Sequence, residues 1–494
     1  MSLALGIDVS TTATKALLLS EKGEVVSVAS SSYELSTPRP LWAEQDPRLW
    51  WEAACQAVKR ALQEAGAAAD SVCGVGLTGQ MHGLVLLDES GEVLRPAILW
   101  NDQRASAQCD EIRRRLGLRK LVEITGNDAF PGFTLPKLMW VRRHEPEIYS
   151  RLRRVLLPKD YLRYKLTGGF ATDKAGAGGT LMLDLRSRDW SPELLQAFDV
   201  PSSWLPPTHE GTEVTGEISA SGSRFTGLAV GTPVVGGGGD QAAGAVGTGA
   251  CKPGVVSLTL GTSGVVFASS ERPLTDDKGA LHAFPHALPG TWHVMGVMLS
   301  AAGSLRWHRD VAAAGMDFAE LVQEAADIAP GCDGLLFLPY LSGERTPHAD
   351  PKARGAFLGL TLSHQRAHMT RAVLEGVAFA LADNLALMQR VGISGVRQIR
   401  LAGGGAQSPV WRQILADVLD TELVAVEAPE GAALGAAMLA GIATGLWPDI
   451  EQATQAAVNL GQPIRPRPDS AEAYRPHYDR FREAYRSLRP LFEL

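Results

Sequence analysis

The feature that most constrains the fold is a strand–turn–strand pattern that occurs twice, about half a chain apart. In the first copy, LALGIDVSTTATKALLLS, apolar strands over 3–8 and 14–20 flank a hydroxyl-rich turn. The second copy, GVVSLTLGTSGVVFASS from Gly254, again predicts two strands around a small turn. Such weak self-similarity between halves is typical of a duplicated domain, although two unrelated hairpins would give the same pattern.

The remaining pattern alternates strands with helices and therefore predicts an α/β protein. Apolar runs predict short strands, helical spacing predicts three long helices, and a Pro-rich stretch predicts turns. The expected strands are 25–31, 74–77, 84–87, 230–239 and 400–405, the helices 47–64, 365–391 and 408–419, and the turns 192–207. We place the boundary between the halves within 247–254, which gives domains 1–247 and 248–494.

Composition excludes several classes of protein. With 47 Lys and Arg against 54 Asp and Glu and no basic stripe, a nucleic-acid partner is not expected. The 5 cysteines are dispersed, which indicates reduced thiols in a cytoplasmic protein. The N-terminus does not resemble a signal peptide, and the blandest stretch, 431–445, is too short to span a bilayer, so no membrane partner is expected.

Asp8 ends the first strand and is followed by Ser10, Thr11, Thr12 and, further on, Lys15. A carboxylate beside small hydroxyl residues can hold a metal ion, and the backbone N–H groups of such a turn can bind a phosphate. Lys15 would add a cation within reach of the same turn. An ordinary β-turn, with the side chains bonded to their own backbone, explains the pattern as well.

Two further turns in the second half are also open to two interpretations, a nucleotide-binding turn or an ordinary one. Gly261-Thr262-Ser263-Gly264 is either a second phosphate clamp or a plain hairpin loop, and clamps from both halves would suit a nucleotide held between them. Gly403-Gly404-Gly405, between a strand and a helix, is either a backbone platform for a nucleotide or a tight turn.

Four consecutive glycines precede Asp240 and Gln241. Glycines allow a close approach of the backbone to a ligand, and Asp240 would then sit at or beside the N-terminus of a helix. An ionised aspartate placed there can accept a hydroxyl proton while a phosphoryl group arrives in line. The competing interpretation is an N-cap aspartate after a flexible turn.

Two polar loops in the first half suit a polyhydroxylated ligand. Glycines bracket Gln80, Met81 and His82 on a bend, where polar groups and an apolar wall meet. Trp100 and Asn101 follow an apolar strand and place an aromatic face beside an amide. A satisfied core histidine and a plain surface loop are the respective alternatives.

Taken together, these residues resemble the FGGY carbohydrate kinases, relatives of the actin and heat-shock-chaperone ATPases. Two stretches resemble the two diffuse signatures of that family, in the right order. They are GFTLPKLMWVRRH from Gly132, with Lys137 and Trp140 at the expected places, and GAFLGLTLSHQRAHMTRAVLE from Gly355. The resemblance covers essentially the whole chain and implies two ribonuclease H-like domains flanking a central cleft.

Within the family the chain looks most like the kinases that phosphorylate D-xylulose with ATP and Mg²⁺. Four stretches carry this: LWAEQDP from Leu41, GQMHG from Gly79, PAILWNDQR from Pro96 and FLPYLSGERTPH from Phe337. The resemblance implies that Asp240 is the catalytic proton acceptor and that Asp8 is the carboxylate that supports magnesium. It implies a pentulose site formed by Met81, His82, Gln241, Trp100 and Asn101. It also implies a nucleotide site formed by Thr11, Thr12, Lys15, Gly261, Thr262, Gly404 and Gly405.

Two residues depart from the family pattern. Ser10 stands where most members carry Gly, and Gln241 stands where members acting on D-xylulose often have Asn. The longer amide of Gln241 leaves L-ribulose, another ketopentose or a pentitol as alternative acceptors. A non-kinase ATPase and a sugar sensor without catalysis are the alternatives of another class, and the sequence leaves a homodimer open.

Overall fold

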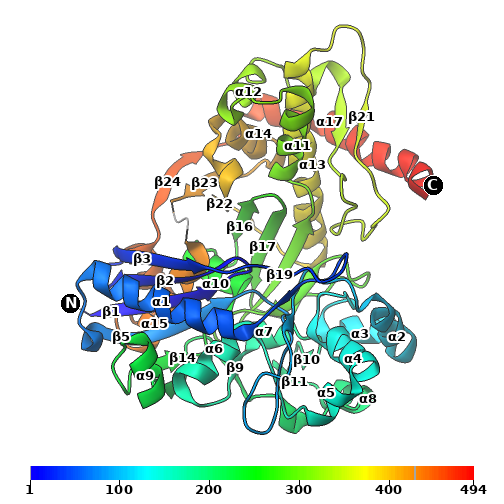
Figure 1. Ribbon diagram of the computed structural model, residues 1–494. Helices are drawn as coiled ribbons and strands as arrows, with labels where there is room; N and C mark the ends of the chain where they lie inside the picture. Colours follow the sequence, from blue (N-terminus) through cyan, green and yellow to red (C-terminus); the bar gives the residue numbers. More distant parts are fainter. Residues whose placement is uncertain (1, 428–429, 494) are drawn as a thin grey trace.

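The computed structural model describes residues 2–427 and 430–493, and two seven-stranded sheets dominate it (Figure 1). In the first sheet, β1 pairs antiparallel with β2 and parallel with β5, so the opening hairpin lies inside the sheet. Its strands are β13 (Val214–Glu217), β14 (Pro233–Val235), β5 (Val72–Gly79), β1 (Leu3–Val9), β2 (Ala13–Ser20) and β3 (Val25–Ser32), with β15 (Gly238–Gly239) also on β5.

The second sheet repeats this arrangement. β16 pairs antiparallel with β17 and parallel with β22, as β1 does with β2 and β5. Its order is β18 (His282–Pro285), β19 (Trp292–Met298), β17 (Gly264–Ser270), β16 (Val255–Leu260), β22 (Gln398–Ala402), β23 (Glu422–Val426) and β24 (Leu460–Ile464). The duplication predicted from the two hairpins is therefore confirmed.

Two helices pack closely against each other and against the first sheet, namely α10 (Asp240–Gly247) and α15 (Gly431–Ala443). A Cβ atom at Gly247 would lie 1.8 Å from the carbonyl oxygen of Gly431, and one at Gly435 would lie 1.8 Å from that of Ala243. α15 also packs on the first sheet, because a Cβ at Gly6 would lie 2.0 Å from the carbonyl oxygen of Ala433. Glycine is thus required where these backbones touch.

The long helix α13 (Arg366–Val391) is the core of the second half. By length and composition it passes as a candidate membrane span, but most of it is buried inside the fold, as in the core helix of a globular protein. It packs against α14 (Pro409–Leu419) and β20 (Leu336–Leu338).

A helical region of the first half, which includes α2 (Ser106–Leu116), α4 (Thr134–His144) and α8 (Pro192–Ala197), lies against the end of the second sheet (Figure 1). Phe133 from this region and Phe284 and Met295 from the second sheet belong to one buried apolar cluster. The expectation of turns throughout 192–207 was wrong for 192–197. Ser191 caps a helix there by accepting from the N–H of Leu194, and a proline occupies its first turn.

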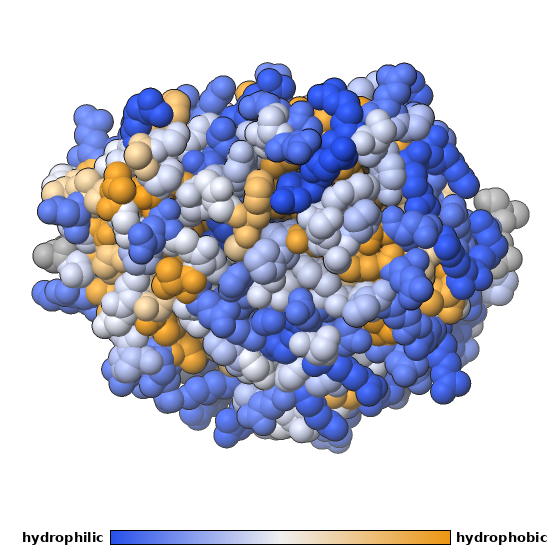
Figure 2. Space-filling model, turned by 90° about the horizontal axis from the view of Figure 1, so that it is seen from below, coloured by the Kyte–Doolittle hydropathy of each residue, from blue (hydrophilic) through white to orange (hydrophobic). Residues whose placement is uncertain are grey.

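The surface and the cysteines are ordinary. The face seen in Figure 2 carries scattered apolar side chains among hydrophilic ones rather than one continuous apolar area. All five cysteines are unpaired, as predicted.

Candidate active site

Asp8 lies near the end of β1, directly opposite Lys15 of β2 in the antiparallel register. Its Oδ1 atom is buried and has no hydrogen-bond partner in the part of the chain that the structure describes. Burial raises the pKa of Asp8 to about 6, and the charge of Lys15 partly opposes this. Lys15 itself is half-buried and forms an ion pair with Glu430, so its charge is shared rather than free.

The first turn, defined as Ser10–Ala13, is closed by the side chain of Ser10. Its hydroxyl donates to the carbonyl oxygen of Ala13 at 2.8 Å and accepts from the Ala13 N–H at 3.2 Å. The Tyr33 hydroxyl donates to the Ser10 carbonyl oxygen at 2.7 Å, while Thr12 is exposed at the tip. Ser10, the residue that departs from the family pattern, therefore braces this turn.

Thr11 connects the first turn to the polar loops. Its hydroxyl accepts from Nε1 of Trp100 at 3.0 Å and donates to Oε1 of Gln80 at 3.4 Å, and Gln45 donates to its carbonyl oxygen at 2.7 Å. The Thr11 hydroxyl is thus already engaged, and the N–H groups of Ser10, Thr12 and Ala13 donate within the turn. What the turn offers a phosphate is therefore mainly the exposed side chain of Thr12.

Asp102 and Arg104, which follow directly in the chain, anchor the loop that carries Trp100 and Asn101. Buried Asp102 accepts from the N–H of Ala43 and from the guanidinium of Arg104, which lies 3.7 Å from the ring of Trp42. Trp100 remains 45% exposed, and the buried Oδ1 of Asn101 has no partner among the described residues. An exposed ring and an unpartnered amide oxygen leave both residues with groups that a ligand could contact, and their assignment to the acceptor stays a prediction.

His82 has a positive φ of 69° and is held by several groups. Its carbonyl oxygen accepts from Nζ of fully buried Lys137, the signature lysine, at 2.8 Å. Its Nδ1 lies 2.6 Å from the carbonyl oxygen of Gly179; because a carbonyl only accepts, Nδ1 carries the proton and Nε2 is a free acceptor. Burial lowers the pKa of His82 to about 3, so the ring is neutral at pH 7. Met81, beside it, is nearly buried and forms an apolar wall.

Asp240 is the first residue of α10, as predicted. The glycine run before it is forced by close approach, since a Cβ atom at Gly237 (φ 69°) would lie 1.9 Å from the carbonyl oxygen of Leu77. The fully buried Arg163 fixes the run further by donating to the Gly236 carbonyl oxygen at 2.8 Å. Burial, and then the charge of Asp8, raise the pKa of Asp240 to about 7, although Gln241 opposes this by hydrogen bonding to the carboxylate.

The second turn, Gly261–Gly264, is held by backbone alone. The N–H groups of Ala301 and Gly303 donate to the carbonyl oxygen of Thr262 at 2.8 and 3.1 Å, and that of Ala302 donates to Gly261 at 2.9 Å. These three residues begin the helix α11 (Ala302–Ala312) or immediately precede it. The turn is therefore an extension of that helix N-terminus.

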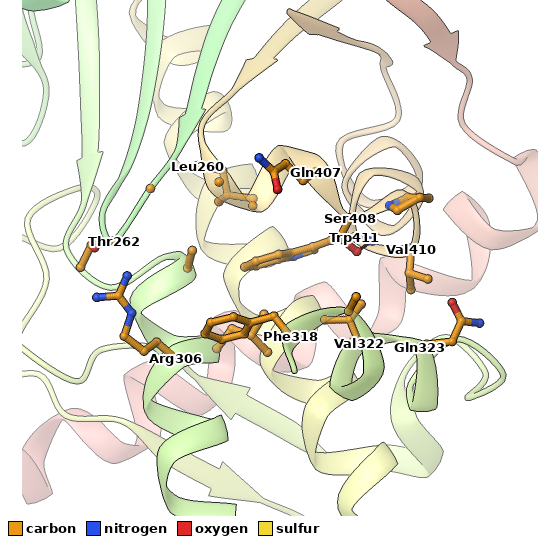
Figure 3. A pocket seen from close by; sticks show the side chains of 17 residues that line it. Leu260, Thr262, Arg306, Phe318, Val322, Gln323, Gln407, Ser408, Val410 and Trp411 are labelled. Carbon is orange, nitrogen blue, oxygen red and sulfur yellow. Dashed lines mark hydrogen bonds between the residues drawn. The ribbon is translucent and has the colours of Figure 1, made fainter. Parts of the chain in front are cut away.

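Two cavities meet at the second turn. A cavity of about 950 Å³ runs from Asp240 and Gln241 past Gly261 to Gly404. A neighbouring pocket of about 620 Å³ shares Gly261 and Gly404 and is lined more by apolar groups. Figure 3 shows Trp411 and Phe318 on facing sides of this second pocket, with Thr262 and Arg306 toward one end. The structure thus places Asp240 in the larger cavity, Thr262 and Gly405 in the neighbouring pocket, and Gly261 and Gly404 where the two adjoin.

Sequence reasoning missed several residues around these cavities. Gly179 contributes a carbonyl oxygen, which leaves no signal in a sequence, and Phe318 and Arg306 belong to helices that carry no motif. His282 and Arg345 lie beside the His82 region. Arg345 belongs to the stretch FLPYLSGERTPH, whose resemblance was noted without assigning a site.

Comparison with known proteins settles the family. The model of the FGGY carbohydrate kinase N-terminal domain matches residues 3–247, and that of the C-terminal domain matches residues 256–444. The chain belongs to the FGGY family of carbohydrate kinases. It is therefore an enzyme of two ATPase domains of the actin type, and kinases of this family take ATP as the phosphoryl donor.

Among full-length relatives of this FGGY kinase, xylulose kinase of Escherichia coli (strain K12) is 46% identical over 99% of both chains. Gluconokinase of Bacillus subtilis (strain 168) is 34% identical over 96% of this chain and 94% of its own. The solved structure of xylulose kinase from Rhodospirillum rubrum superposes with a TM-score of 0.94 at 34% identity and covers both chains fully. A glycerol kinase from Plasmodium falciparum, at 22% identity and a TM-score of 0.88, shares the fold.

Proposed function

We propose that this FGGY kinase transfers the γ-phosphoryl group of ATP to the terminal hydroxyl of D-xylulose, giving D-xylulose 5-phosphate and ADP. The observation that carries the proposal is the hollow that joins Asp240 to the pocket between Trp411 and Phe318. The similarity to xylulose kinases over 99% of the chain supports the choice of acceptor.

Asp240 acts as the proton acceptor. The acceptor oxygen forms a bond to the γ-phosphorus while the bond to the bridging oxygen of ADP breaks, and the hydroxyl proton passes to the Asp240 carboxylate. A pKa near 7 suits a general base at neutral pH, because the group is then both available as a base and strong enough to take the proton.

The acceptor lies between Asp240 and the two polar loops of the first half. Neutral His82 accepts a hydrogen bond from a sugar hydroxyl at Nε2, and Asn101 offers an Oδ1 atom that has no partner in residues 2–427 and 430–493. Trp100 supplies an exposed ring face, Met81 an apolar wall and Gln241 an amide next to the base.

The nucleotide lies along the second half. Its base occupies the pocket of Trp411 and Phe318 against Gly404 and Gly405, and its phosphates run between the two turns, past Gly261 and Thr262. Thr11, Thr12 and Lys15 face the same phosphates from the first half. We also propose that domains 1–247 and 248–494 close on the substrates and exclude water, whose attack would waste ATP.

The residues present fit a magnesium ion. Mg²⁺ in kinases is held by one or two carboxylates plus phosphate oxygens and water, and the orphaned buried oxygen of Asp8 is such a ligand. When bound, the ion supplies charge that offsets the phosphates. In the described part of the chain no group of three potential ligands gathers into a protein-only metal site.

Phosphoryl transfer to another acceptor is the second candidate. The amide of Gln241 lies next to Asp240, and because it is longer than the Asn often found there, it changes the space left for the sugar. L-Ribulose, D-ribulose, glycerol and ribitol cover the ketopentose, triol and pentitol alternatives. ADP release with ATP and Mg²⁺ is measured with each of them and with D-xylulose. Strong stimulation by D-xylulose alone supports the proposal, stimulation by another compound moves only the acceptor, and turnover independent of any sugar contradicts a kinase of these acceptors.

The role of Asp240 is tested by Asp240→Ala in the same assay. The variant should lose transfer by about 10³-fold while still binding sugar and nucleotide in calorimetry. A variant that keeps more than a few per cent of the wild-type rate would show that another group takes the proton.

A further inference from the structure

Arg345, in the loop between β20 and β21 (Ala356–Leu358), carries a charge that no carboxylate of the described residues pairs with. It is partly buried, and this burial lowers the pKa of its guanidinium below the ordinary value. No side-chain carboxylate of residues 2–427 and 430–493 forms an ion pair with it, and its nearest side-chain partner is His282, with Nη1 3.5 Å from Nε2. A partly buried guanidinium without a counter-charge carries a desolvation cost, which a ligand with negative or hydrogen-bond-accepting oxygens would offset.

The adjacent carboxyl of Glu344 does not supply the missing charge. Its Oε1 accepts from the N–H groups of Leu299 and Arg345 at 3.0 and 2.8 Å, so it is turned toward the backbone. Burial raises the pKa of Glu344 to about 8, and the group is therefore mostly protonated at pH 7.

His282 orients Arg345 without satisfying it. The Nδ1 atom of His282 lies 2.9 Å from Oδ1 of Asn127, whose Nδ2 donates to the carbonyl oxygen of Ala283. Oδ1 is therefore the acceptor, Nδ1 carries the proton, and Nε2 accepts from Arg345. Burial keeps the pKa of His282 well below its ordinary value, so the ring stays neutral. One guanidinium N–H is used in this way, and the other N–H groups of the guanidinium have no hydrogen-bond partner in the part of the chain that the structure describes.

A row of rings connects Arg345 with the acceptor site. Its guanidinium lies 5.3 Å from the ring of Phe130, and the rings of His282 and Phe133 are 5.8 Å apart. Phe133 in turn lies 4.6 Å from the ring of His82. Arg345 thus lies on the side of His82 that the second half of the chain contributes. Asp240 lies on the side of Met81, because Gly239, the residue before it, packs against the Met81 side chain.

We propose that Arg345 binds the oxygen-bearing end of the acceptor opposite the hydroxyl that is phosphorylated, and that the site consequently also takes acyclic sugar acids. The carbonyl end of a ketopentose offers this guanidinium hydrogen-bond acceptors. A carboxylate at the same end offers two oxygens in the geometry that arginine pairs with best. This proposal rests on the proposed function, because it assumes that the acceptor lies between Asp240 and His82.

The test compares Arg345→Met and Arg345→Lys with Arg354→Met, an exposed arginine of the same loop that donates to two backbone carbonyl oxygens of that loop. Expected results are a rise of at least about tenfold in the KM for D-xylulose for Arg345→Met, a smaller rise for Arg345→Lys, and an unchanged KM for MgATP. The inhibition constant of D-xylonate should rise at least as much, and Arg354→Met should behave as wild type. An unchanged D-xylulose KM and D-xylonate inhibition in Arg345→Met would overturn the proposal.

A measurement on the wild-type protein keeps the proposal falsifiable if the variants do not fold. D-Xylonate should bind more tightly than the neutral analogue xylitol in calorimetry, and tighter binding of xylitol would contradict a guanidinium at that end. If D-xylulose is not phosphorylated at all, the proposed function fails, and the calorimetric preference for the acid still decides the assignment of Arg345.

Discussion

The two turns that we assign to the nucleotide phosphates occupy equivalent places in the two sheets but are held by different means. Side chains from separate loops hold the first turn, with Trp100, Gln45 and Gln80 meeting at Thr11. The second turn is held by backbone N–H groups at the start of one helix. The strand before the first turn also carries Asp8, whereas Thr259 stands two residues before the second.

This difference assigns the turns different partners. The first turn is bonded to the loops that we place around the acceptor, so a change in those loops reaches it directly. The second turn is continuous with α11, whose residues line the pocket assigned to the nucleotide base. In our proposal both turns face the phosphates, but the first is coupled to the acceptor loops and the second to the nucleotide pocket.

The largest effect is expected at the carboxylate that distinguishes the two strands. Asp8→Asn keeps the shape but removes the charge that would hold Mg²⁺, and kcat should fall by about 10³-fold. The matched change on the second strand, Thr259→Val, should alter kcat by less than about threefold. Steady-state kinetics at saturating MgATP measures both, and equal losses would mean that the strands do not differ in this way.

The sequence predicted the repeat and the position of Asp240 at a helix start, because strand periodicity, glycine runs and helix starts are local signals. Lys137 was noted only through its place in a family signature, and its burial was not predicted. It did not show that Thr11 is engaged by Trp100, nor that Lys15 pairs with Glu430, since these partners are 89 and 415 residues apart. Backbone acceptors such as Gly179 leave no trace in residue types. What the sequence lacked was the pairing of distant loops, which packing alone decides.

A smaller effect is expected on KM, where a change at the second turn should affect MgATP and not the acceptor. A Cβ atom at Gly303 would lie 2.9 Å from the carbonyl oxygen of Thr262, so Gly303→Ala displaces the second turn. The KM for MgATP should rise by about tenfold while the KM for the acceptor stays unchanged. Gly169→Ala, where a Cβ meets nothing nearer than 3.6 Å, is the control. A rise in the acceptor KM alone would contradict the assignment of this turn to the nucleotide.

The link between the first turn and the acceptor loop is tested by Trp100→Phe, which keeps a ring but removes the N–H donor to Thr11. We expect sugar to tighten the binding of a non-hydrolysable ATP analogue, and the ratio of the two dissociation constants measures this coupling. In Trp100→Phe the ratio should fall by about fivefold, which corresponds to the loss of one hydrogen bond. Calorimetry with and without sugar measures this ratio.

The Thr11→Val variant completes a double-mutant cycle with Trp100→Phe and so tests the Trp100–Thr11 hydrogen bond itself. It should show the same loss, and the double variant should lose no more than either single change. Additive losses would mean that Trp100 and Thr11 act on the two substrates separately.

The smallest effect concerns the two carboxylates in the substrate-free protein. Burial raises the pKa of both above the ordinary 3.8, to about 6 for Asp8, which faces Lys15, and to about 7 for Asp240. A raised pKa means that ionisation costs native stability, so the cost is absent below about pH 4 and grows until the pH passes the native pKa. Removing the carboxylate should therefore stabilise the protein at high pH and not at low pH.

Asp240→Asn should accordingly raise the free energy of unfolding at pH 8 by roughly 1–2 kcal/mol, less than the full shift implies because the side chain is partly open to the cavity. Asp8→Asn should gain less, and its gain should level off nearer pH 6, because Lys15 already offsets part of the cost in the wild type. Thermal melts from pH 4 to 8 without Mg²⁺ or nucleotide measure both curves. A gain that is larger for Asp8→Asn would show that Lys15 is committed to Glu430 and does not offset the burial of Asp8. A gain that shrinks as the pH rises would contradict a raised pKa in either carboxylate.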